Sequence, residues 1–397
     1  MIEAMNVVGR RWWPTLRVLL LVLAVFSLLS LFLTKVVRPV LPTIAGDAHF
    51  FTPNTDVEVE NSRRIQEAEK LLADLQLRDA VSASDKATLL PDADVLVVVI
   101  ATSRQGQYLT QVTAQLLDQA RRLRGDLSIQ PVICSVDRRD TLFDEAAQLS
   151  PLLPVVRLHN ETVPPPPDRQ VRLQWEAQDY FGCLNASRTL PTRARYVLLL
   201  EDDAMIVPSF FPLLSTIIKQ IERPRSGEPA AYVKLYHPAY LRGLPFYVQC
   251  VCCSIILSLL VLYALRRWLT SRGFMFVLFL LQLVLYFFLF KLLSHQFFAD
   301  ARYLVTGSVY LTMPESCCTP AVLYTASALP SLVSYLSANP TGNGRAKDHI
   351  LDEAPSKLGV TGLMTDTNLV VHIGRFSTLR AGPVNLDSIS VVNRKVG

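Results

Sequence analysis

Three long segments of this chain carry no charged side chain. They are residues 18–34, 244–265 and 273–290. Each is close to the length that a helix needs to cross a hydrocarbon core about 30 Å thick. Buried helices of soluble proteins are seldom this apolar over this length three times in one chain. The pattern therefore predicts an N-terminal membrane anchor and, later in the chain, a pair of membrane helices.

Between the first and second of these segments, short apolar runs alternate with amphipathic stretches. Buried strands are predicted where a run is wholly apolar, at residues 94–101, 132–136, 153–158 and 196–200. Helices are predicted where apolar positions recur every three or four residues, at residues 62–77, 108–124 and 171–187. Gly125 is the predicted C-cap of the second helix. This order of elements is typical of a mostly parallel α/β sheet with crossover helices.

The same criteria apply on either side of the membrane pair. Residues 232–236, 303–312 and 369–373 are strand-like, the second with a turn at its glycine, and residues 320–336 are predicted to be helical. Residues 339–345 are predicted to form a turn.

Basic residues indicate how the chain crosses the membrane. Arg10, Arg11 and Arg17 precede the first segment, and no small-residue cleavage site follows it, so we expect a retained anchor. The loop 266–272 carries three arginines and is therefore expected in the cytosol. The predicted organisation is a cytosolic tail (1–17), an anchor (18–34), a stalk (35–58), a membrane hairpin (244–292), and one lumenal α/β domain made of residues 59–243 and 293–397.

Composition agrees with a membrane protein that has a lumenal domain. Of the 397 residues, 50% are hydrophobic, and the formal charge is +5. Two sequons, at Asn160 and Asn185, are candidate glycosylation sites. Four cysteines lie in the lumenal portion, where disulfides can form, with no pairing readable from the sequence: Cys134, Cys183, Cys317 and Cys318. We expect no nucleic-acid partner.

Three consecutive acids follow the apolar run 196–200. Glu201, Asp202 and Asp203 would project from the carboxyl end of a strand, which is where open α/β sheets bind ligands. A divalent cation would relieve the repulsion between them and would also bind the phosphates of a nucleotide. The alternative is that these acids only form a turn and cap the helix that begins near Pro208.

Polar residues also follow the two earlier strands. Thr102, Ser103 and Arg104 could bind the ribose and phosphate oxygens of a nucleotide, and Asp137 could hold uracil or ribose. The alternative is an ordinary polar loop and a turn cap. The chain has neither of the two glycine-rich phosphate motifs, so phosphates would have to be met by a metal and by side chains.

His372 lies inside the apolar run 369–373. A histidine in such a strand is more often part of the core than a ligand. If this strand returns to the acid triplet, however, its imidazole could complete a metal site or contact a diphosphate.

Two of these motifs carry a resemblance to known enzymes. The segments LLLEDDA (198–204) and VVHIGRFSTL (370–379), with one N-terminal span and a two-helix insertion, resemble the Golgi GPI N-acetylgalactosamine transferase family. The resemblance implies a GT-A-like glycosyltransferase domain interrupted by a transmembrane hairpin and located in the Golgi membrane. The acid triplet and the HIGRFS segment also resemble the N-acetylglucosaminyltransferase IV group, which branches N-glycans.

The first resemblance implies a substrate pair and a metal. The donor would be UDP-GalNAc, the cofactor Mn²⁺ or Mg²⁺, and the acceptor a mannose of the GPI core on GPI-anchored proteins. Glu201–Asp203 match the family's variant of the DxD motif, with Asp203 and then Asp202 as candidate metal ligands. His372 matches a histidine near the diphosphate.

An inverting transfer also needs a carboxylate to accept the proton of the acceptor hydroxyl. The polar cluster at 347–353 offers Asp348 first, with Asp352 or Glu353 as alternatives. The competing interpretation of this cluster is a solvated helix start.

Two other classes of function stay open. One is an N-acetylglucosaminyltransferase of the N-glycan-branching type, and the other is a noncatalytic membrane protein whose α/β domain binds glycolipids. A transporter is disfavoured because the three spans contain no acid or base apart from Lys291 and His295 at one end.

Overall fold

The computed structural model describes residues 2–37, 57–82, 89–123, 127–223, 230–237, 243–267, 271–314, 316–339 and 346–376. The chain divides into two compact units. One consists of Met1–Pro42 with Arg242–Gly307, and the other consists of Thr43–Leu241 with Ser308–Gly397. Each is described by itself.

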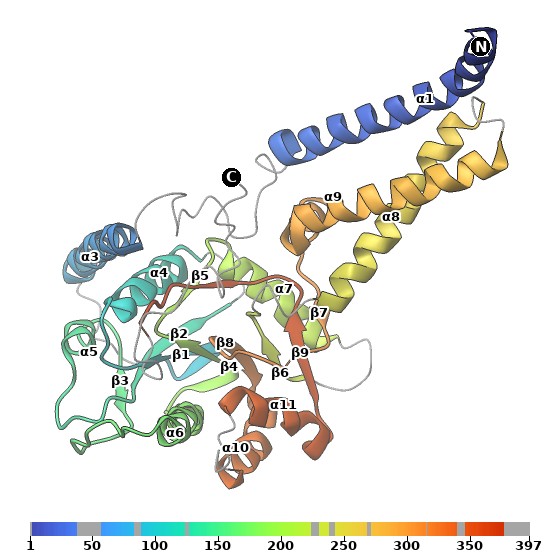
Figure 1. Cartoon of the computed structure of the whole chain (residues 1–397). Helices are drawn as coiled ribbons and strands as arrows, with labels where there is room; N and C mark the ends of the chain where they lie inside the picture. Colours follow the sequence, from blue (N-terminus) through green and yellow to red (C-terminus); the bar gives the residue numbers. More distant parts are fainter. Residues whose placement is uncertain are drawn as a thin grey trace. The chain divides into compact units, whose positions relative to one another are not determined.

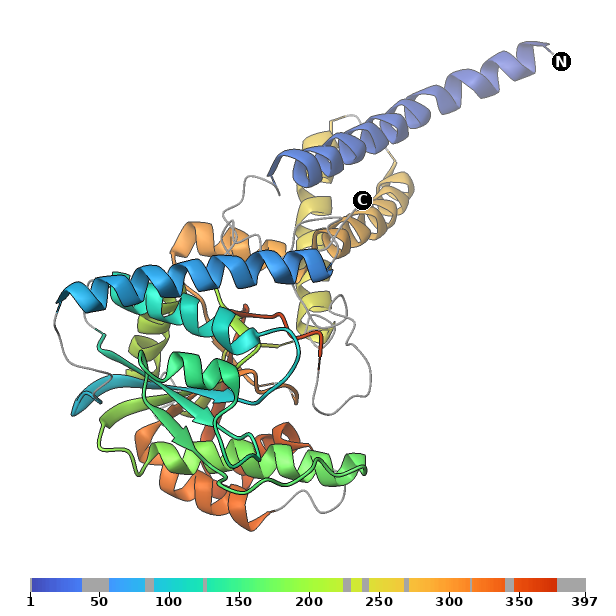
Figure 2. The same cartoon turned by 90° about the vertical axis from the view of Figure 1, so that its left-hand side faces the viewer.

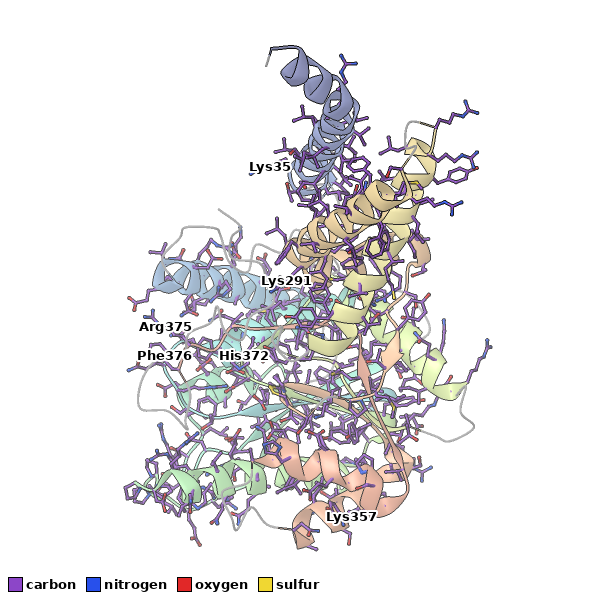
Figure 3. All side chains as sticks on the ribbon, turned by 45° about the vertical axis from the view of Figure 1, so that its right-hand side comes forward. Lys35, Lys291, Lys357, His372, Arg375 and Phe376 are labelled. Carbon is purple, nitrogen blue, oxygen red and sulfur yellow. A yellow bond between two sulfur atoms is a disulfide. The ribbon has the colours of Figure 1, made fainter. Side chains whose placement is uncertain are left out.

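The first unit contains the apolar helices. They are α1 (Ile2–Leu31), continued by a π-helical turn η1 (Phe32–Val37), α8 (Gly243–Leu265) and α9 (Arg272–Thr306). The windows Arg17–Val37, Phe246–Leu265 and Arg272–Leu293 are long and apolar enough to cross a membrane. Lys35 and Lys291 lie on these helices (Figure 3). The three predicted spans are therefore candidate membrane helices in the structure as well.

The second unit is built on an 8-stranded sheet with the order β3-β2-β1-β4-β8-β6-β9-β7. Its strands are β1 (Asp92–Ala101), β2 (Ile129–Ser135), β3 (Val155–Arg157), β4 (Arg193–Glu201), β6 (Ala230–Lys234), β7 (Leu311–Thr312), β8 (Ala321–Thr325) and β9 (Thr361–Thr365). β1, β2, β3 and β4 run parallel. β8 lies antiparallel between β4 and β6, β9 is parallel to β6, and β7 closes the edge antiparallel to β9.

Helices cover both faces of this sheet (Figures 1 and 2). On one face lie α3 (Val57–Ser82), α4 (Tyr108–Arg122), α5 (Asp144–Leu149) and α7 (Phe210–Glu222). On the other lie α6 (Arg169–Ser187), α10 (Leu329–Ala338) and α11 (Lys347–Leu358). The predicted α/β class is confirmed.

The core explains why β4 is central. Its residues Tyr196–Leu200 are all buried because helices cover both sides of the strand. On one side α6 presents Ala177, Tyr180 and Leu184, which recur at spacings of three and four residues and pack in one hydrophobic cluster with Val197. A disulfide between Cys134 and Cys183 joins β2 to α6.

A second, 2-stranded sheet lies beyond the end of β4. It pairs β5 (Ala204–Ile206) with β10 (Val370–His372) in antiparallel register. His372 stands opposite Ala204, the residue after the acid triplet. This short pairing brings the C-terminal part of the described chain to the end of β4.

The sheet is mostly parallel, as predicted, because only β8 and β7 run against the direction that the other strands share. Two predictions about elements were wrong. Most of residues 303–312 are not a strand, because α9 continues to Thr306. Gly307 then ends the helix in a left-handed conformation with φ 63°, and within this stretch only Leu311–Thr312 form a strand.

The second error concerns residues 320–336, which are not one helix. Residues 321–325 read AVLYT, a β-branched and aromatic run that forms β8, and the short 3-10 turn η3 (Ala326–Ala328) follows. The helix α10 begins only at Leu329, with a proline in its first turn.

Some predictions fall outside the described residues. They are the cap at Gly125, stalk residues 38–56 and the turn residues 340–345. The division into tail, anchor, stalk, hairpin and lumenal domain stays a prediction.

Candidate functional site

The acid triplet lies where β4 ends. Glu201 is the last residue of β4, and Asp202 and Asp203 form the turn that leads into β5. The backbone oxygen of Asp203 accepts a hydrogen bond from Ile373 N at 2.9 Å, just after β10. Both aspartates are only 2% exposed. Buried acids require partners, because burying an unpaired charge is costly.

Arg104 supplies much of that partnership. Its guanidinium forms an ion pair with Asp202, and its Nη1 lies 2.9 Å from Asp203 Oδ2. The backbone N–H of Thr102 donates to Asp202 Oδ2 at 3.2 Å. Burial would raise the pKa of Asp203, but Arg104 and His372 outweigh that effect and hold the pKa below its usual value. Two of the residues predicted to meet a nucleotide therefore hold the acids in place.

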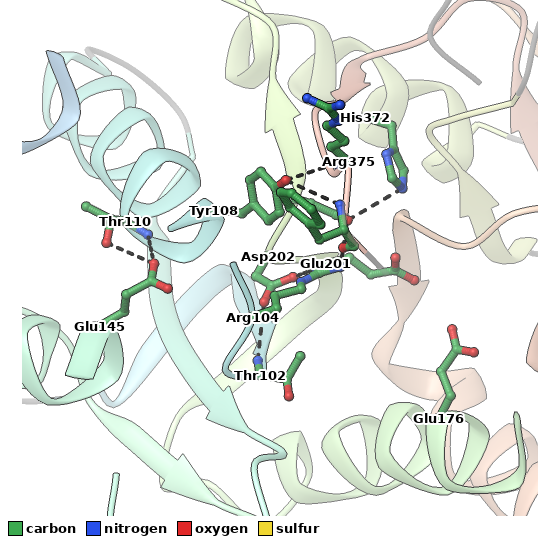
Figure 4. Close-up of polar contacts among 12 residues, drawn as sticks. Thr102, Arg104, Tyr108, Thr110, Glu145, Glu176, Glu201, Asp202, His372 and Arg375 are labelled. Carbon is green, nitrogen blue, oxygen red and sulfur yellow. Dashed lines mark hydrogen bonds and ion pairs between the residues drawn. The ribbon is translucent and has the colours of Figure 1, made fainter. Parts of the chain in front are cut away.

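His372 reaches the triplet through the pairing of β10 with β5. Its Nε2 lies 3.6 Å from Asp203 Oδ2. Glu201, Asp203 and His372 each offer one ligand atom, and these atoms all lie within 4.8 Å of one another. Figure 4 shows His372 and Glu201 approaching the same space from different strands.

These residues fit a divalent cation. Asp203 Oδ1 and His372 Nδ1 are buried and accept or donate no hydrogen bond among the described residues. A buried carboxylate oxygen that accepts no hydrogen bond is unusual and energetically costly, and binding a metal ion would remove that cost. Two carboxylates and an imidazole are ligands that ions such as Mn²⁺ accept. Asp202 is not part of this group, since its oxygens face Arg104 and Thr102.

The segment after His372 is attached to the start of α4. The hydroxyl of Tyr108 accepts hydrogen bonds from the backbone N–H groups of Arg375 and Phe376, at 2.9 and 3.4 Å. Arg104 donates to the backbone oxygen of Phe376 at 3.3 Å. His372, Arg375 and Phe376 follow one another along this segment (Figure 3). These contacts hold the segment that follows His372 next to Arg104 and the acid triplet.

A cavity of about 520 Å³ opens beside the triplet. It is lined by the ends of β1, β2 and β4, by α6, by the loop before α6, and by the first residue of α11. This volume is within the range of about 300–1,000 Å³ typical of small-molecule sites. The lining includes the predicted residues Thr102, Ser103, Arg104, Asp137, Glu201 and Asp202. The strand ends therefore meet at one site, as an α/β sheet predicts.

An aromatic and basic group lines the part of the cavity near β2. The guanidinium of Arg138 lies 4.1 Å over the ring of Trp175 and 2.8 Å from Asp179 Oδ1. His159 Nε2 lies 2.7 Å from the same oxygen. Burial raises the pKa of nearby Asp137 more than Arg139 lowers it. The sequence does not single out this group, because its members come from the segment after β2, the segment after β3, and α6.

Lys347, the first residue of α11, links two carboxylates in the cavity. Its Nζ lies 2.6 Å from Glu176 Oε1 and 2.7 Å from Glu201 Oε1. Burial alone would lower the pKa of Lys347, but the two carboxylates outweigh this effect and raise it. Burial raises the pKa of Glu176 more than Lys347 lowers it. Glu176 and Glu201 point toward each other from α6 and the end of β4 (Figure 4).

A comparison with known protein families agrees with this geometry. The family model for GPI-N-acetylgalactosamine transferase PGAP4 matches residues 95–371. This chain belongs to that family. The match begins in β1, runs through α8 and α9, and ends in β10. The apolar helix pair is therefore part of the matched region, as are the acid triplet and Lys347.

Membership of the PGAP4 family makes the chain a glycosyltransferase with a GPI-related acceptor. The two carboxylates predicted as the base of such a transferase have partners of their own. Asp348 Oδ2 accepts from Cys318 N at 3.0 Å, and Asp352 forms an ion pair with the fully buried Lys234. Burial raises the pKa of Asp352 more than Lys234 lowers it. The cavity lining contains neither residue, nor Glu353, and their role as base stays a prediction.

The structure also places the remaining candidates. Asn160 is exposed in the loop after β3, and Asn185 is exposed near the end of α6, so both asparagines are accessible on the described surface. Cys317 and Cys318 form a disulfide with each other. Glycosylation at the two sequons stays a prediction.

Proposed function

We propose that this chain is a metal-dependent Golgi enzyme that transfers GalNAc from UDP-GalNAc to a mannose of the GPI core on GPI-anchored proteins. The observation that carries the proposal is the group of Glu201, Asp203 and His372, of which Glu201 lines the cavity, in a chain of the PGAP4 family.

Different cavity residues would bind different parts of the donor. Thr102, Ser103 and Asp137 would bind the nucleoside at the ends of β1 and β2. Arg104 would meet the diphosphate, because a guanidinium binds phosphate oxygens in a fixed geometry. Asp203, His372 and Glu201 would hold Mn²⁺ or Mg²⁺, which would neutralise charge on the departing UDP.

Asp348 is our proposed base for the acceptor hydroxyl. If the donor fills the cavity, the acceptor must approach from beyond it, and Asp348 directly follows the cavity residue Lys347. Asp352 is the alternative, although Lys234 already neutralises its charge.

The apolar helices support an acceptor that is itself attached to a membrane. A catalytic unit tethered by three spans stays close to the bilayer, where the lipid anchor also keeps a GPI glycan. Such tethering raises the effective concentration of the acceptor. We propose a cytosolic N-terminus, a cytosolic loop at 266–272, and a lumenal catalytic unit.

The test is complementation of cells that lack the gene, with the variant Asp203→Asn. We expect the variant protein to reach the Golgi while the HexNAc side branch of GPI stays absent in glycan mass profiles. Asp74→Asn, an exposed change on α3, is the matched control and should restore the branch. A restored branch with Asp203→Asn would reject the site. A loss of N-glycan antennae in the cells, with GPI unchanged, would instead support the N-glycan-branching alternative.

The metal itself is tested by calorimetry on the purified protein. We expect Mn²⁺ to bind the wild type and to bind His372→Ala and Asp203→Asn at least tenfold more weakly. The exposed His349→Ala is the control for the loss of an imidazole. Equal Mn²⁺ binding by all four proteins would show that the ion binds elsewhere.

A further inference from the structure

The end of the cavity formed by α6 and α11 has no assigned ligand group. Glu176 and Lys347 lie there, side by side, and both belong to the cavity lining. The predicted nucleoside residues lie at the ends of β1 and β2 instead. In a nucleotide sugar, the diphosphate separates the sugar from the nucleoside. If the diphosphate meets the acid triplet and the nucleoside lies at the ends of β1 and β2, the sugar is left with the end of the cavity formed by α6 and α11.

The two side chains still have hydrogen-bonding capacity. Glu176 uses Oε1 for Lys347, and its Oε2 has no hydrogen-bond partner among the described residues. Lys347 donates to Glu176 and Glu201, which leaves one of the three N–H groups of an ammonium. A hydroxyl both donates and accepts a hydrogen bond. An acceptor oxygen next to a donor N–H therefore suits the hydroxyl groups of a hexose.

The position of the pair is also fixed. Lys347 stands between the two carboxylates, and its ammonium lies 5.0 Å from the centre of the Tyr180 ring. Since a single ammonium separates Glu176 from Glu201, the Glu176 carboxylate lies next to the triplet rather than at the aromatic end near Arg138. Pre-positioned groups of this kind discriminate strongly, because a ligand that lacks the matching hydroxyl leaves them unpaired.

We propose that Glu176, held by Lys347, recognises the hydroxyl groups of the donor sugar. This inference rests on the proposed function, since it assumes a nucleotide-sugar donor. It assigns Glu176 to the binding of the sugar and leaves the nucleotide to other residues. Lys347 acts as a positioning residue that keeps the Glu176 carboxylate turned toward the sugar.

The test compares binding of UDP and of UDP-GalNAc to purified full-length protein by calorimetry in the presence of Mn²⁺. For Glu176→Gln we expect UDP to bind within about twofold of the wild type and UDP-GalNAc to bind about tenfold more weakly. The KM for UDP-GalNAc should rise by a similar factor. Asp168→Asn is the matched control, since it removes one carboxylate charge at the exposed N-cap of the same helix.

Each other outcome overturns the inference. If Glu176→Gln weakens UDP and UDP-GalNAc equally, the residue serves the nucleotide or the metal. If the Glu176→Gln variant binds UDP and UDP-GalNAc normally but turns over slowly, Glu176 acts in the chemical step. Should Glu176→Gln fail to fold, Glu176→Asp, which keeps the charge but withdraws the oxygens, must show the same selective loss, and a loss shared with UDP rejects the proposal.

The same experiment separates this inference from the function on which it rests. If the wild-type protein binds no UDP-sugar, the proposed function fails. If the wild type binds UDP-GalNAc more tightly than UDP and Glu176→Gln keeps that difference, only the role of Glu176 fails.

Discussion

A methyl group on the α-carbon of Gly374 would lie 2.0 Å from the Oδ2 atom of Asp203. No side chain can be accommodated at that distance. The carboxylate cannot easily give way, because it is buried and Arg104 holds the same oxygen. Glycine at position 374 is therefore required for the close approach of the segment after β10 to the acid triplet.

This contact predicts the effect of Gly374→Ala. The added methyl group should displace Asp203 or the strand that carries His372, and an error of about 1 Å at such a site costs roughly a hundredfold in rate. Transfer to a GPI acceptor, measured as kcat at saturating donor, checks the prediction. Gly273→Ala is the control, because nothing lies within 4 Å of the added atom. Wild-type kcat for Gly374→Ala would contradict the geometry.

Removal of Arg104 should leave two buried acids without their main cation. Breaking such a buried pair costs about 3–5 kcal/mol, because the remaining charges stay desolvated. Arg104→Ala should therefore unfold at a lower temperature than the wild type. If the acids bind a cation, adding Mn²⁺ should raise the unfolding temperature of Arg104→Ala by more than it raises that of the wild type.

Arg195→Ala is the matched control for this experiment. Its side chain is 58% exposed and pairs with Asp94 and Glu222 at the surface. Such pairs contribute about 0–1 kcal/mol. If Arg104→Ala and Arg195→Ala unfold at the same temperature, groups other than Arg104 must stabilise the charges of the two buried aspartates.

Tyr108→Phe tests the attachment of the segment after His372. The substitution removes the acceptor for the backbone N–H groups of Arg375 and Phe376. Each lost hydrogen bond should cost about 0.5–1.5 kcal/mol. We expect faster hydrogen exchange at residues 373–376 and a lower rate of transfer. Tyr335→Phe on α10 should leave that exchange unchanged, and unchanged exchange in Tyr108→Phe as well would disprove the attachment.

The disulfide between Cys134 and Cys183 should contribute to the stability of the catalytic unit. It joins residues separated by 49 positions, β2 on one side and α6 on the other. Replacing both cysteines by serine should cost about 2–5 kcal/mol. Thermal unfolding of the double variant measures this loss. Cys252→Ser, at an exposed free cysteine, should have no comparable effect. A double variant as stable as the wild type would show that the link is dispensable.

Local pattern was sufficient to predict much of this protein. Wholly apolar runs revealed β1, β2 and β4, because strands covered on both faces need no polar positions. The same reasoning placed Glu201, Asp202 and Asp203 at the end of β4. The three candidate membrane helices followed from length and lack of charge alone.

Other parts depended on contacts between distant segments. The sequence of residues 320–336 contains both strand-forming and helix-forming signals, and pairing with β4 and β6 decided in favour of β8. Residues 303–306 have strand-like side chains, yet they continue a helix that began at Arg272. Propensity is a weak preference that such tertiary contacts override.

The sequence by itself determined the α/β class, the apolar helices and the position of the acid triplet, because each depends on neighbouring residues along the chain. Only the tertiary structure decided that His372 lies 3.6 Å from Asp203, that Arg104 forms ion pairs with both aspartates, and that Lys347 joins Glu176 to Glu201. Those contacts join residues from separate strands and helices. A buried charged group needs an oppositely charged partner, and which residue becomes that partner depends on how distant segments pack in the folded chain. The local sequence pattern does not contain that information.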